Sequence, residues 1–305
     1  MTGVINTGSH PKLLWPGIRE IWGQVYDSHP TQYTSLYDVR NSSRAYEQDV
    51  QVTGFGLAPV KTQGGQISYD SEMQGWVTTY AHIAYALGYI VTKEELEDNP
   101  YKEVSQRRAK ANAFSINQTT ENVAAFLYNN AFVNTFFTTP DGRPLIDTAH
   151  VNASGGLFSN RLTTPADLSE ASIEDMCIQI MQATQDRGLR ISVMPRSLHI
   201  PPQEWYNANR ILKSVLQNNS GNNAINVLKA TNALPEGIHL NHYFTDPDAW
   251  FVRTNVMNGM TMFWRNKPVF AQDNDFDTMN AKAATYMRFS VGCTDPRGIF
   301  GSPGA

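Results

Sequence analysis

The sequence predicts an α+β fold, and three stretches of the chain support this prediction. Between Tyr46 and Tyr69 the residues follow a strand-like alternation that folds back on itself. From Pro100 to Asn130 a helical pattern continues for about 30 residues. Beyond Ser169, short helical and strand patterns alternate, which indicates an α/β or α+β unit. A long two-stranded ribbon is marginal by itself, so we expect it to pack against another surface, including that of a second copy of the chain.

The composition is that of a folded protein and argues against several functions. The 305 residues are 41% hydrophobic and carry a net charge of −4, which provides no basic surface for reading a nucleic-acid sequence. Only 17% of the residues are charged, and neutral amides replace part of the usual charged surface. Low charge is typical of the cores of protein interfaces, and drift in composition is the alternative explanation.

The two cysteines, Cys177 and Cys293, are too few for a disulfide framework and lack the spacing of a metal site. We expect both thiols to be buried and reduced, as in a protein made in a cytosol. The N-terminal residues lack the layout of a signal peptide, and no apolar run reaches the roughly 18 residues of a membrane span. We therefore expect neither export nor a membrane anchor.

Residues 1–44 are expected to form an extended arm, because no hydrophobic periodicity is sustained there and prolines interrupt the segment. Trp15 and Trp22 lie on this arm and need a neighbouring surface to cover them. A folded cap is the alternative.

The ribbon is predicted to have strand arms at Asp49–Thr53 and Ile67–Tyr69, joined by a flexible tip. After it, Thr92–Glu95 has the spacing of a capping box for a short helix. Asn99 then caps the long helix, and Pro100 occupies its first position. This helix is expected to run from solvent into a core near Leu127.

The second half of the chain starts with a turn at Pro140–Pro144, and we expect a domain boundary before Pro165. Ser169 is predicted to cap an amphipathic helix that Gly188 ends, and Pro202 to open another helix. The predicted strands are Ile191–Val193, Leu198–Ile200, Ile238–Phe244, Trp250–Thr254, Met260–Trp264 and a final strand with Met287, Phe289 and Val291 on one face.

The sequence lacks the common signatures of catalysis and cofactor binding. No Gly-Lys dipeptide is present to form a phosphate-binding loop, and Gly54-Phe55-Gly56 lacks the third glycine of a dinucleotide turn. A Gly-x-Ser-x-Gly elbow, a Cys-x-x-Cys pair and a His-Glu-x-x-His helix are absent as well. We therefore expect no catalytic residue and no cofactor.

Histidines form two weak constellations. Asp147 and His150 are compatible with a base and its orienting carboxylate, but no motif places a nucleophile beside them, so a hydrogen bond that fixes a loop is the favoured interpretation. His239 and His242 lie three apart on a predicted strand and therefore on opposite faces, which argues against a shared metal ion.

Asp273, Asp275 and Asp277 mimic the start of a calcium loop. The sixth position is Thr278 where glycine is needed, and the twelfth is Ala284 where a bidentate glutamate is needed. A solvated acidic turn is the favoured interpretation, so no metal is expected.

The order of these elements resembles that of the major capsid proteins of tailed bacteriophages, which have the Hong Kong 97-type fold, and especially the Mu-like major head subunits. The most specific local element is Asp141-Gly142-Arg143-Pro144-Leu145-Ile146-Asp147-Thr148-Ala149-His150, which is similar to the motif that follows the long helix in that group. The other segments match in order and length more than in residue type.

The resemblance implies a division of the whole chain. It assigns residues 1–44 to an N-arm, 45–81 to an extended E-loop hairpin, 82–164 and 265–290 to a peripheral domain with the long spine helix, and 165–264 and 291–305 to an α/β axial domain.

The resemblance also implies the function of a major head subunit, which assembles as hexamers and pentamers into the icosahedral shell of the virion around packaged double-stranded DNA. A separate scaffold protein, a portal and a decoration protein are the implied partners, with no membrane, and assembly is implied in the host cytoplasm. A bacterial nanocompartment shell of the same fold and a soluble α+β hydrolase that uses His150 are the alternatives.

Contacts between subunits are expected at Trp15, Trp22, Lys61, Gln63, Gln66, Asn274 and Asn280. Some relatives join an E-loop lysine covalently to a peripheral-loop asparagine, so Lys61 is expected either to pack against a neighbouring copy or to bond to its Asn274 or Asn280.

Overall fold

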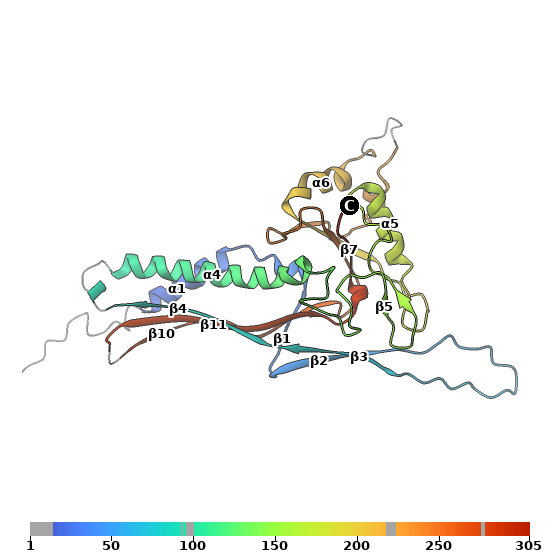
Figure 1. The fold of residues 1–305 in the computed structure, drawn as a ribbon, viewed down its shortest axis with the longest axis horizontal. Helices are drawn as coiled ribbons and strands as arrows, with labels where there is room; N and C mark the ends of the chain where they lie inside the picture. The colour runs from blue at the N-terminus through green and yellow to red at the C-terminus, as the bar shows by residue number, and fades with distance from the viewer. Residues whose placement is uncertain (1–14, 93, 96–100, 218–223, 276–277) are drawn as a thin grey trace, which may run out of the picture.

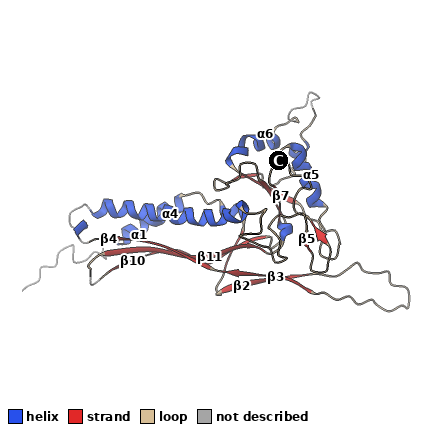
Figure 2. Cartoon of the chain, in the orientation of Figure 1, coloured by secondary structure: helices blue, strands red, loops and turns tan. Residues whose placement is uncertain are grey.

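The computed structural model describes residues 15–92, 94–95, 101–217, 224–275 and 278–305, and within them it confirms an α+β fold (Figures 1 and 2). One long, curved sheet with helix α4 along it forms one end of the chain. A smaller body that contains helices α5 and α6 forms the other end, and a two-stranded hairpin projects beneath this body. The described residues contain no helix that combines the length and apolar character of a membrane span.

The long sheet has the strand order β1-β10-β11-β4. Its strands are β1 (Asp38–Asn41), β10 (Met260–Asn274), β11 (Ala281–Cys293) and β4 (Ile83–Val91). Strands β10 and β11 are antiparallel neighbours from the pair Met260 and Cys293 to the pair Asn274 and Ala281. Strand β4 is an edge strand, because it pairs only with β11 in this sheet.

Helix α4 (Tyr101–Asn129) covers one face of the long sheet. It confirms the predicted long helix and, at 29 residues, extends over about 43 Å. The predicted starting residues Asn99 and Pro100 lie outside the described residues. Leu127 and Tyr128 of α4 pack in one core with Met287 and Phe289 of β11, which confirms that the helix runs into a core.

The N-terminal segment corrects the expectation of an extended arm. Residues 15–28 form helix α1 (Trp15–Ser28), and a short helix, α2 (Tyr33–Leu36), follows. Pro16 does not prevent the helix because proline is tolerated in a first turn. Ile18, Trp22 and Tyr26 are spaced four residues apart and form one helical face, a signal that the sequence analysis missed.

Trp22 is buried within its own chain, with only 6% of its surface exposed. Its indole ring stacks on Phe270 of β10 with ring centroids 5.6 Å apart, and its Nε1 donates a hydrogen bond to Asn112 Oδ1 at 3.0 Å. Trp22 is therefore covered within its own chain, and the folded alternative describes this segment better. A contact of Trp22 with a neighbouring subunit stays a prediction. The side chain of Trp15 lies outside the described part of the chain.

The smaller body is built on a sheet of order β12-β9-β7-β8. Its strands are β7 (Pro195–Ile200), β8 (Ile238–Leu240), β9 (Trp250–Thr254) and β12 (Ile299–Ser302). Its helical elements are α5 (Glu170–Met181), η3 (Pro202–Glu204), α6 (Trp205–Lys213) and α7 (Val227–Ala230). Trp250 and Phe300 pack with Ile173 and Met176 of α5 in its core.

Several sequence predictions in this body are confirmed and others are wrong. Ser169 caps α5 as predicted, accepting a hydrogen bond from the Ser172 amide at 3.2 Å, and β9 has its predicted bounds. Helix α5 ends at Met181, not Gly188, because the chain turns back and Thr184 pairs with Arg190. The predicted strand Ile191–Val193 is not formed, and β8 stops at Leu240.

Strands β10 and β11 continue without a break across the positions where the domain boundaries were predicted, after residues 264 and 290. Residues 260–264 consequently belong to the long sheet, together with the rest of β10. The division into peripheral and axial domains stays a prediction, and two shared strands would connect those domains.

The hairpin consists of β2 (Tyr46–Val52) and β3 (Gln74–Ala81), which pair antiparallel. The predicted outgoing arm is confirmed, but the returning arm starts at Gln74, not Ile67. Three alternating residues before Asp70 and Ser71 are too few to extend the ladder, so residues 53–73 form a long irregular tip. Short strands β5 (His150–Val151) and β6 (Leu157–Phe158) and the turn η4 (Pro296–Gly298) lie near the base of the hairpin.

Candidate functional site: the projecting hairpin and its anchor

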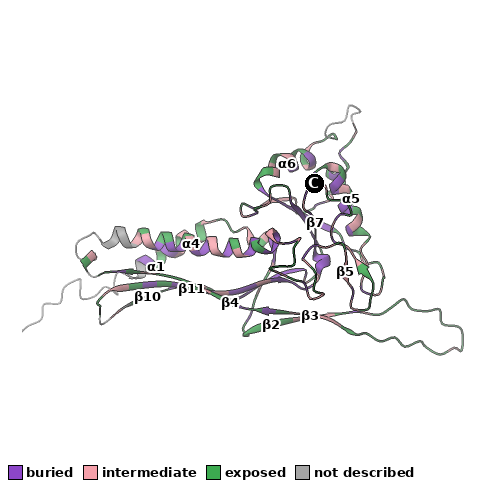
Figure 3. Cartoon of the chain, viewed as in Figure 1, coloured by how far each residue is buried: buried purple, intermediate pink, exposed green. Residues whose placement is uncertain are grey.

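The hairpin tip presents apolar side chains to solvent. Val60 is 95% exposed and Tyr69 is 91% exposed, and Leu57 and Ile67 are exposed as well. Figure 3 shows exposed and half-buried residues along the whole projection. A two-stranded ribbon has no second layer to cover it, so within one chain these apolar side chains stay in water. Such a surface is typical of a binding site for another protein.

The expected contact residues Lys61, Gln63 and Gln66 are all exposed at this tip. The turn is closed by a hydrogen bond from the Gly65 amide to the Thr62 carbonyl at 3.0 Å. Asn274 ends β10 and Asn280 directly precedes β11, so both lie at the end of the long sheet that is far from the hairpin tip (Figure 1). Lys61 can therefore meet these asparagines only between copies, and all these contacts stay predictions.

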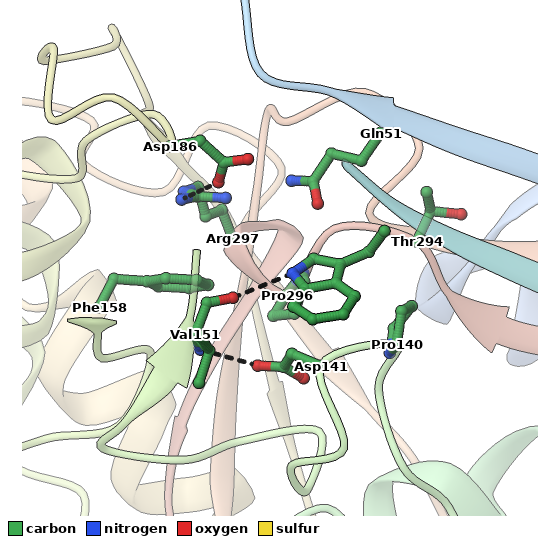
Figure 4. Close-up of a pocket in the computed structure, with 10 residues that line it drawn as sticks. Gln51, Pro140, Asp141, Val151, Phe158, Asp186, Thr294, Pro296 and Arg297 are labelled. Atoms are coloured by element: carbon green, nitrogen blue, oxygen red, sulfur yellow. Dashed lines mark hydrogen bonds and ion pairs between the residues drawn. The ribbon is translucent and has the colours of Figure 1, made fainter. Parts of the chain in front are cut away.

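The root of the hairpin is fixed to the body by hydrogen bonds (Figure 4). Trp76 of β3 donates from Nε1 to the Val151 carbonyl at 3.1 Å. Thr294 Oγ1 lies 2.7 Å from the hydroxyl oxygen of Tyr80 and 3.1 Å from Asp49 Oδ2. Both strands of the hairpin thus contact the body at its base.

A second set of contacts holds the start of the tip. Asp70 Oδ2 accepts hydrogen bonds from the Gly56 amide at 2.8 Å and from Arg187 NH1 at 2.5 Å. Arg187 NH2 also donates to the Ser71 carbonyl at 2.8 Å. The backbone hydrogen bonds from Gly56 and Ser71, followed by that from Arg187, lower the pKa of Asp70. We call Asp70 and Arg187 the hairpin clamp.

Below the root, Asp141 and His150 form an ion pair with 2.8 Å between Asp141 Oδ2 and His150 Nδ1. Burial alone would raise the pKa of Asp141, but hydrogen bonds from His150, Thr139 and the Val151 amide, with the charge of His150, lower it to about 2. The partner of His150 is thus Asp141 and not Asp147, which corrects the sequence-based pairing. The tight turn between Thr139 and Arg143 brings Asp141 back toward His150, and residue spacing does not reveal this.

Arg297 completes this base, and the sequence analysis did not single it out. It is almost fully buried, and its guanidinium lies 4.1 Å from the ring centroid of Phe158, which stacks on His150. It donates to Asn152 Oδ1 at 2.6 Å and to Asp186 Oδ1 at 3.3 Å. A single arginine between Pro296 and Gly298 gave no sequence signal, because its partners come from distant loops.

The hollow beside this base has a volume of only about 10 Å³. A space of this size holds a water molecule and no substrate. The lining residues, which Figure 4 shows, are Gln51, Trp76, Pro140, Asp141, Val151, Phe158, Asp186, Thr294, Pro296 and Arg297. The site is an anchor for the hairpin, which counts against a hydrolase that uses His150.

The other predicted constellations do not come together as metal sites. His242 lies beyond the end of β8 and contacts Gln32 at 2.7 Å through Nδ1, whereas His239 stacks on His199. Asp275 forms a salt bridge of 2.6 Å with Lys282, and Asp277 lies outside the described residues. Within the ranges that the structure describes, no group of three or more His, Cys, Asp or Glu is arranged to hold a metal ion.

The sequence model of a family described as phage capsid protein matches residues 76–301, which is most of the chain. The chain belongs to the phage capsid protein family. Residues of this capsid protein outside the match include all of α1 and β2. No curated protein matches the sequence.

Solved structures show that the capsid protein has the Hong Kong 97-type fold, as predicted. The capsid of Myoviridae phage XM1 is 8% identical, with 100% of both chains covered and a TM-score of 0.55. A chain from Mycobacterium phage Adephagia is 10% identical, with 98% of both chains covered and a TM-score of 0.55. A virus-like particle from Pyrococcus furiosus is 8% identical, with 95% of this chain and 99% of that chain covered and a TM-score of 0.50.

Family membership places the capsid protein in the virion and makes it a structural protein whose copies build a shell. The predicted identity as a major capsid protein of a tailed phage is confirmed, and it fits better than the nanocompartment alternative.

Proposed function

We propose that the capsid protein assembles as hexamers and pentamers into an icosahedral shell around packaged double-stranded DNA, and that the hairpin of each copy overlies a neighbouring copy. The observation that carries this proposal is the contrast along the hairpin. Its root is held by Trp76 and Asp49 and the start of its tip by the hairpin clamp, while Val60 and Tyr69 further along the tip are almost fully exposed. A rigid root with an apolar tip is the arrangement needed to reach across to another subunit.

The net charge of the chain is consistent with DNA that is enclosed by the shell and is not bound specifically by the subunits. A subunit with a net charge of −4 would not bind the phosphate backbone strongly. The shell would therefore be held by contacts between subunits, and DNA would lie beside it without specific binding. A separate scaffold protein, a portal and a decoration protein complete the proposal, with assembly in the host cytoplasm.

A nanocompartment shell is the second candidate, and the likeness to the virus-like particle from Pyrococcus furiosus supports it. The two candidates differ in their contents. Particles that contain packaged DNA favour the phage shell, whereas particles filled with an enzyme cargo favour the nanocompartment.

Electron microscopy of the purified protein, alone and with a separate scaffold protein, tests the proposal. We expect closed shells, and we expect a variant whose residues 57–69 are replaced by a short Gly-Ser turn to remain small particles with an unchanged melting temperature. The matched control replaces the polar residues 218–223 with a Gly-Ser sequence of equal length. Small particles of the wild-type chain under both conditions would overturn the shell function.

A further inference from the structure

A buried histidine lies where the hairpin joins the long sheet. His82 is the single residue between β3, which ends at Ala81, and β4, which begins at Ile83, and only 7% of its surface is exposed. The chain enters the hairpin at the same point, because Ser42 lies between β1 and β2. His82 Nδ1 lies 2.9 Å from Ser290 Oγ of β11, and His82 Nε2 lies 3.1 Å from Ser42 Oγ. This histidine therefore connects the entry and the exit of the hairpin to the long sheet.

The hydrogen bonds around Ser42 decide which nitrogen of His82 carries a hydrogen. The Ser42 hydroxyl lies 2.6 Å from Glu47 Oε1 and donates its only hydrogen to that carboxylate, which can only accept when it is ionised. Ser42 Oγ also accepts from the Arg44 amide at 3.1 Å, and its second lone pair is left for His82. His82 Nε2 is consequently the donor to Ser42, and Nδ1 of the neutral ring accepts from the Ser290 hydroxyl. The neutral ring with its hydrogen on Nε2 satisfies all of these contacts.

This arrangement disfavours a proton on His82. A second hydrogen turns Nδ1 into a donor, so the hydroxyl hydrogen of Ser290, which is only 7% exposed, loses its acceptor. Among the described residues, the charged groups that act on the ring come from three strands, and they are Glu47 of β2, Arg288 of β11 and Arg265 of β10. Arg288 also donates from Nε to the His82 carbonyl at 3.2 Å. Burial, followed by the charge of Arg288, lowers the pKa of His82, and the opposite effect of Glu47 is smaller.

We propose that Glu47, Ser42, His82 and Ser290 form a proton-sensitive hinge lock, which holds the hairpin at one angle to the long sheet while His82 is neutral and opens when His82 gains a proton. Because the closed lock favours the neutral ring, the lock is fully stable above about pH 6.5, the ordinary value for histidine, and weakens as the pH falls below it. The hinge lock is distinct from the hairpin clamp and from the bond between Trp76 and Val151, which attach the hairpin to other loops.

The hinge lock is a property of one chain. Its effect on how the hairpin meets a neighbouring copy rests on the proposed shell function. Both can be measured separately, because the hinge lock can be followed in unassembled subunits of the full chain.

The protonation of His82 tests the hinge lock directly. Nitrogen NMR spectra of the histidine-labelled chain, in which His82→Gln identifies the signal, are expected to show a neutral ring with its hydrogen on Nε2 at about pH 7.5. We expect this ring to gain a proton only below the ordinary histidine value of 6.5. A charged His82 at about pH 7.5, or a hydrogen on Nδ1, would overturn the proposal.

Amide exchange measures whether the hairpin is released. After correction for the intrinsic effect of pH, we expect amides in residues 46–52 and 74–81 of the wild type to exchange about fivefold faster at about pH 5.5 than at about pH 7.5. His82→Gln should remove this difference, because the glutamine amide donates and accepts at any pH. His242→Gln, at an exposed histidine, is the control and should behave like the wild type. An equal response in His82→Gln and the wild type, or no response in the wild type, would sink the hinge lock.

Ser42→Ala should open the hinge lock without a proton. It removes the link between His82 and Glu47, so we expect its hairpin to exchange at about pH 7.5 as fast as that of the wild type at about pH 5.5. Ser43→Ala, at the exposed neighbouring serine, is the matched control, with slow exchange expected. Slow exchange in Ser42→Ala would show that this chain of hydrogen bonds does not hold the hairpin, and the proposal would fail.

The outcomes separate the hinge lock from the shell function. Subunits that show the proton response but form no particles with a scaffold protein would overturn the shell function and leave the hinge lock in place. Particles that form normally from subunits without a proton response would overturn the hinge lock and leave the shell function in place.

Discussion

Helix α1 and the hairpin tip both carry large apolar side chains, and both were expected to find cover on neighbouring subunits. They differ in where that cover is found. In α1, residues four apart share one face, so Ile18 and Trp22 are buried together against α4 and β10. In the hairpin, the irregular tip extends beyond the body and has no second layer to cover it, so Val60 and Tyr69 remain exposed. An aromatic segment therefore indicates an assembly surface only where its geometry prevents burial in its own chain.

A negative charge introduced in the core beside α4 and the same charge introduced at the hairpin tip should give the largest difference in stability. Leu127→Asp places a charge where the side chain is only 4% exposed, and we expect a loss of more than about 4 kcal/mol of unfolding free energy or no soluble protein. Leu57→Asp at the exposed tip is the matched variant, and we expect it to melt like the wild type. Thermal unfolding by circular dichroism measures both, and a natively stable Leu127→Asp protein would contradict the core position of α4.

Removing one apolar side chain from α1 and one from the hairpin tip should give the next largest difference in stability. Trp22→Ala removes a stacked, hydrogen-bonded indole, and we expect a loss of about 3–5 kcal/mol in chemical denaturation. Val60→Ala should leave the free energy of unfolding unchanged and lower the particle yield. If Trp22→Ala instead kept its stability and lost assembly, α1 would belong with the hairpin as an intersubunit contact.

The attachment of the N-terminal segment should also depend on pH. Buried Glu121 of α4 accepts hydrogen bonds from the amides of Gln32 and Tyr33 at 2.8 and 3.0 Å. Burial raises its pKa from 4.5 to about 7, against the lowering effect of these two bonds. The pKa of Glu121 is higher in the folded chain than in the unfolded chain. Glu121 therefore stabilises the folded chain fully below about pH 4.5, and this contribution is lost as the pH rises through about 7.

We therefore expect the unfolding free energy of the wild type to fall by about 2 kcal/mol relative to that of Glu121→Gln between pH 5 and pH 8. Glu20→Gln on the exposed side of α1 is the control, and its curve should follow that of the wild type. Parallel curves for Glu121→Gln and the wild type would show that Glu121 titrates normally in the folded chain.

The hairpin clamp should act locally. Arg187→Ala removes the bonds to Asp70 and to the Ser71 carbonyl, so we expect faster amide exchange and proteolysis in residues 53–73. The global melting temperature should stay close to that of the wild type, because the clamp lies on the surface of the chain. Arg190→Ala, an exposed arginine in the same loop, is the control. Equal protection of the hairpin in both variants would show that its root contacts suffice.

Lys61→Arg should have the smallest effect, because Lys61 is exposed at the tip. We expect it to pack against a neighbouring copy, so assembled particles should give only monomer on denaturing electrophoresis and Lys61→Arg shells should form normally. A covalent ladder that Lys61→Arg abolishes would instead establish a bond from Lys61 to an asparagine, formed with release of ammonia.

Much of the fold could be predicted because its signals are local. The helical pattern before Asn130, the Ser169 cap and the strand pattern of Trp250–Thr254 are each local in the sequence, and each element is present in the structure. The ends of α5 and β8 were predicted less well, because tertiary pairing stopped those elements before their sequence patterns did. The resemblance carried by Asp141–His150 led to the correct family and fold.

The sequence by itself determined the long helix, the outgoing arm of the ribbon and the capsid family. Only the tertiary structure decided that Trp22 is buried, that Asp141 pairs with His150, and that Arg297 joins the loop of Asn152 to the loop of Thr184 and Asp186 beneath the hairpin. The physical reason is that helical and strand patterns report the burial of one face, whereas the partner of that face depends on contacts between residues far apart in the chain.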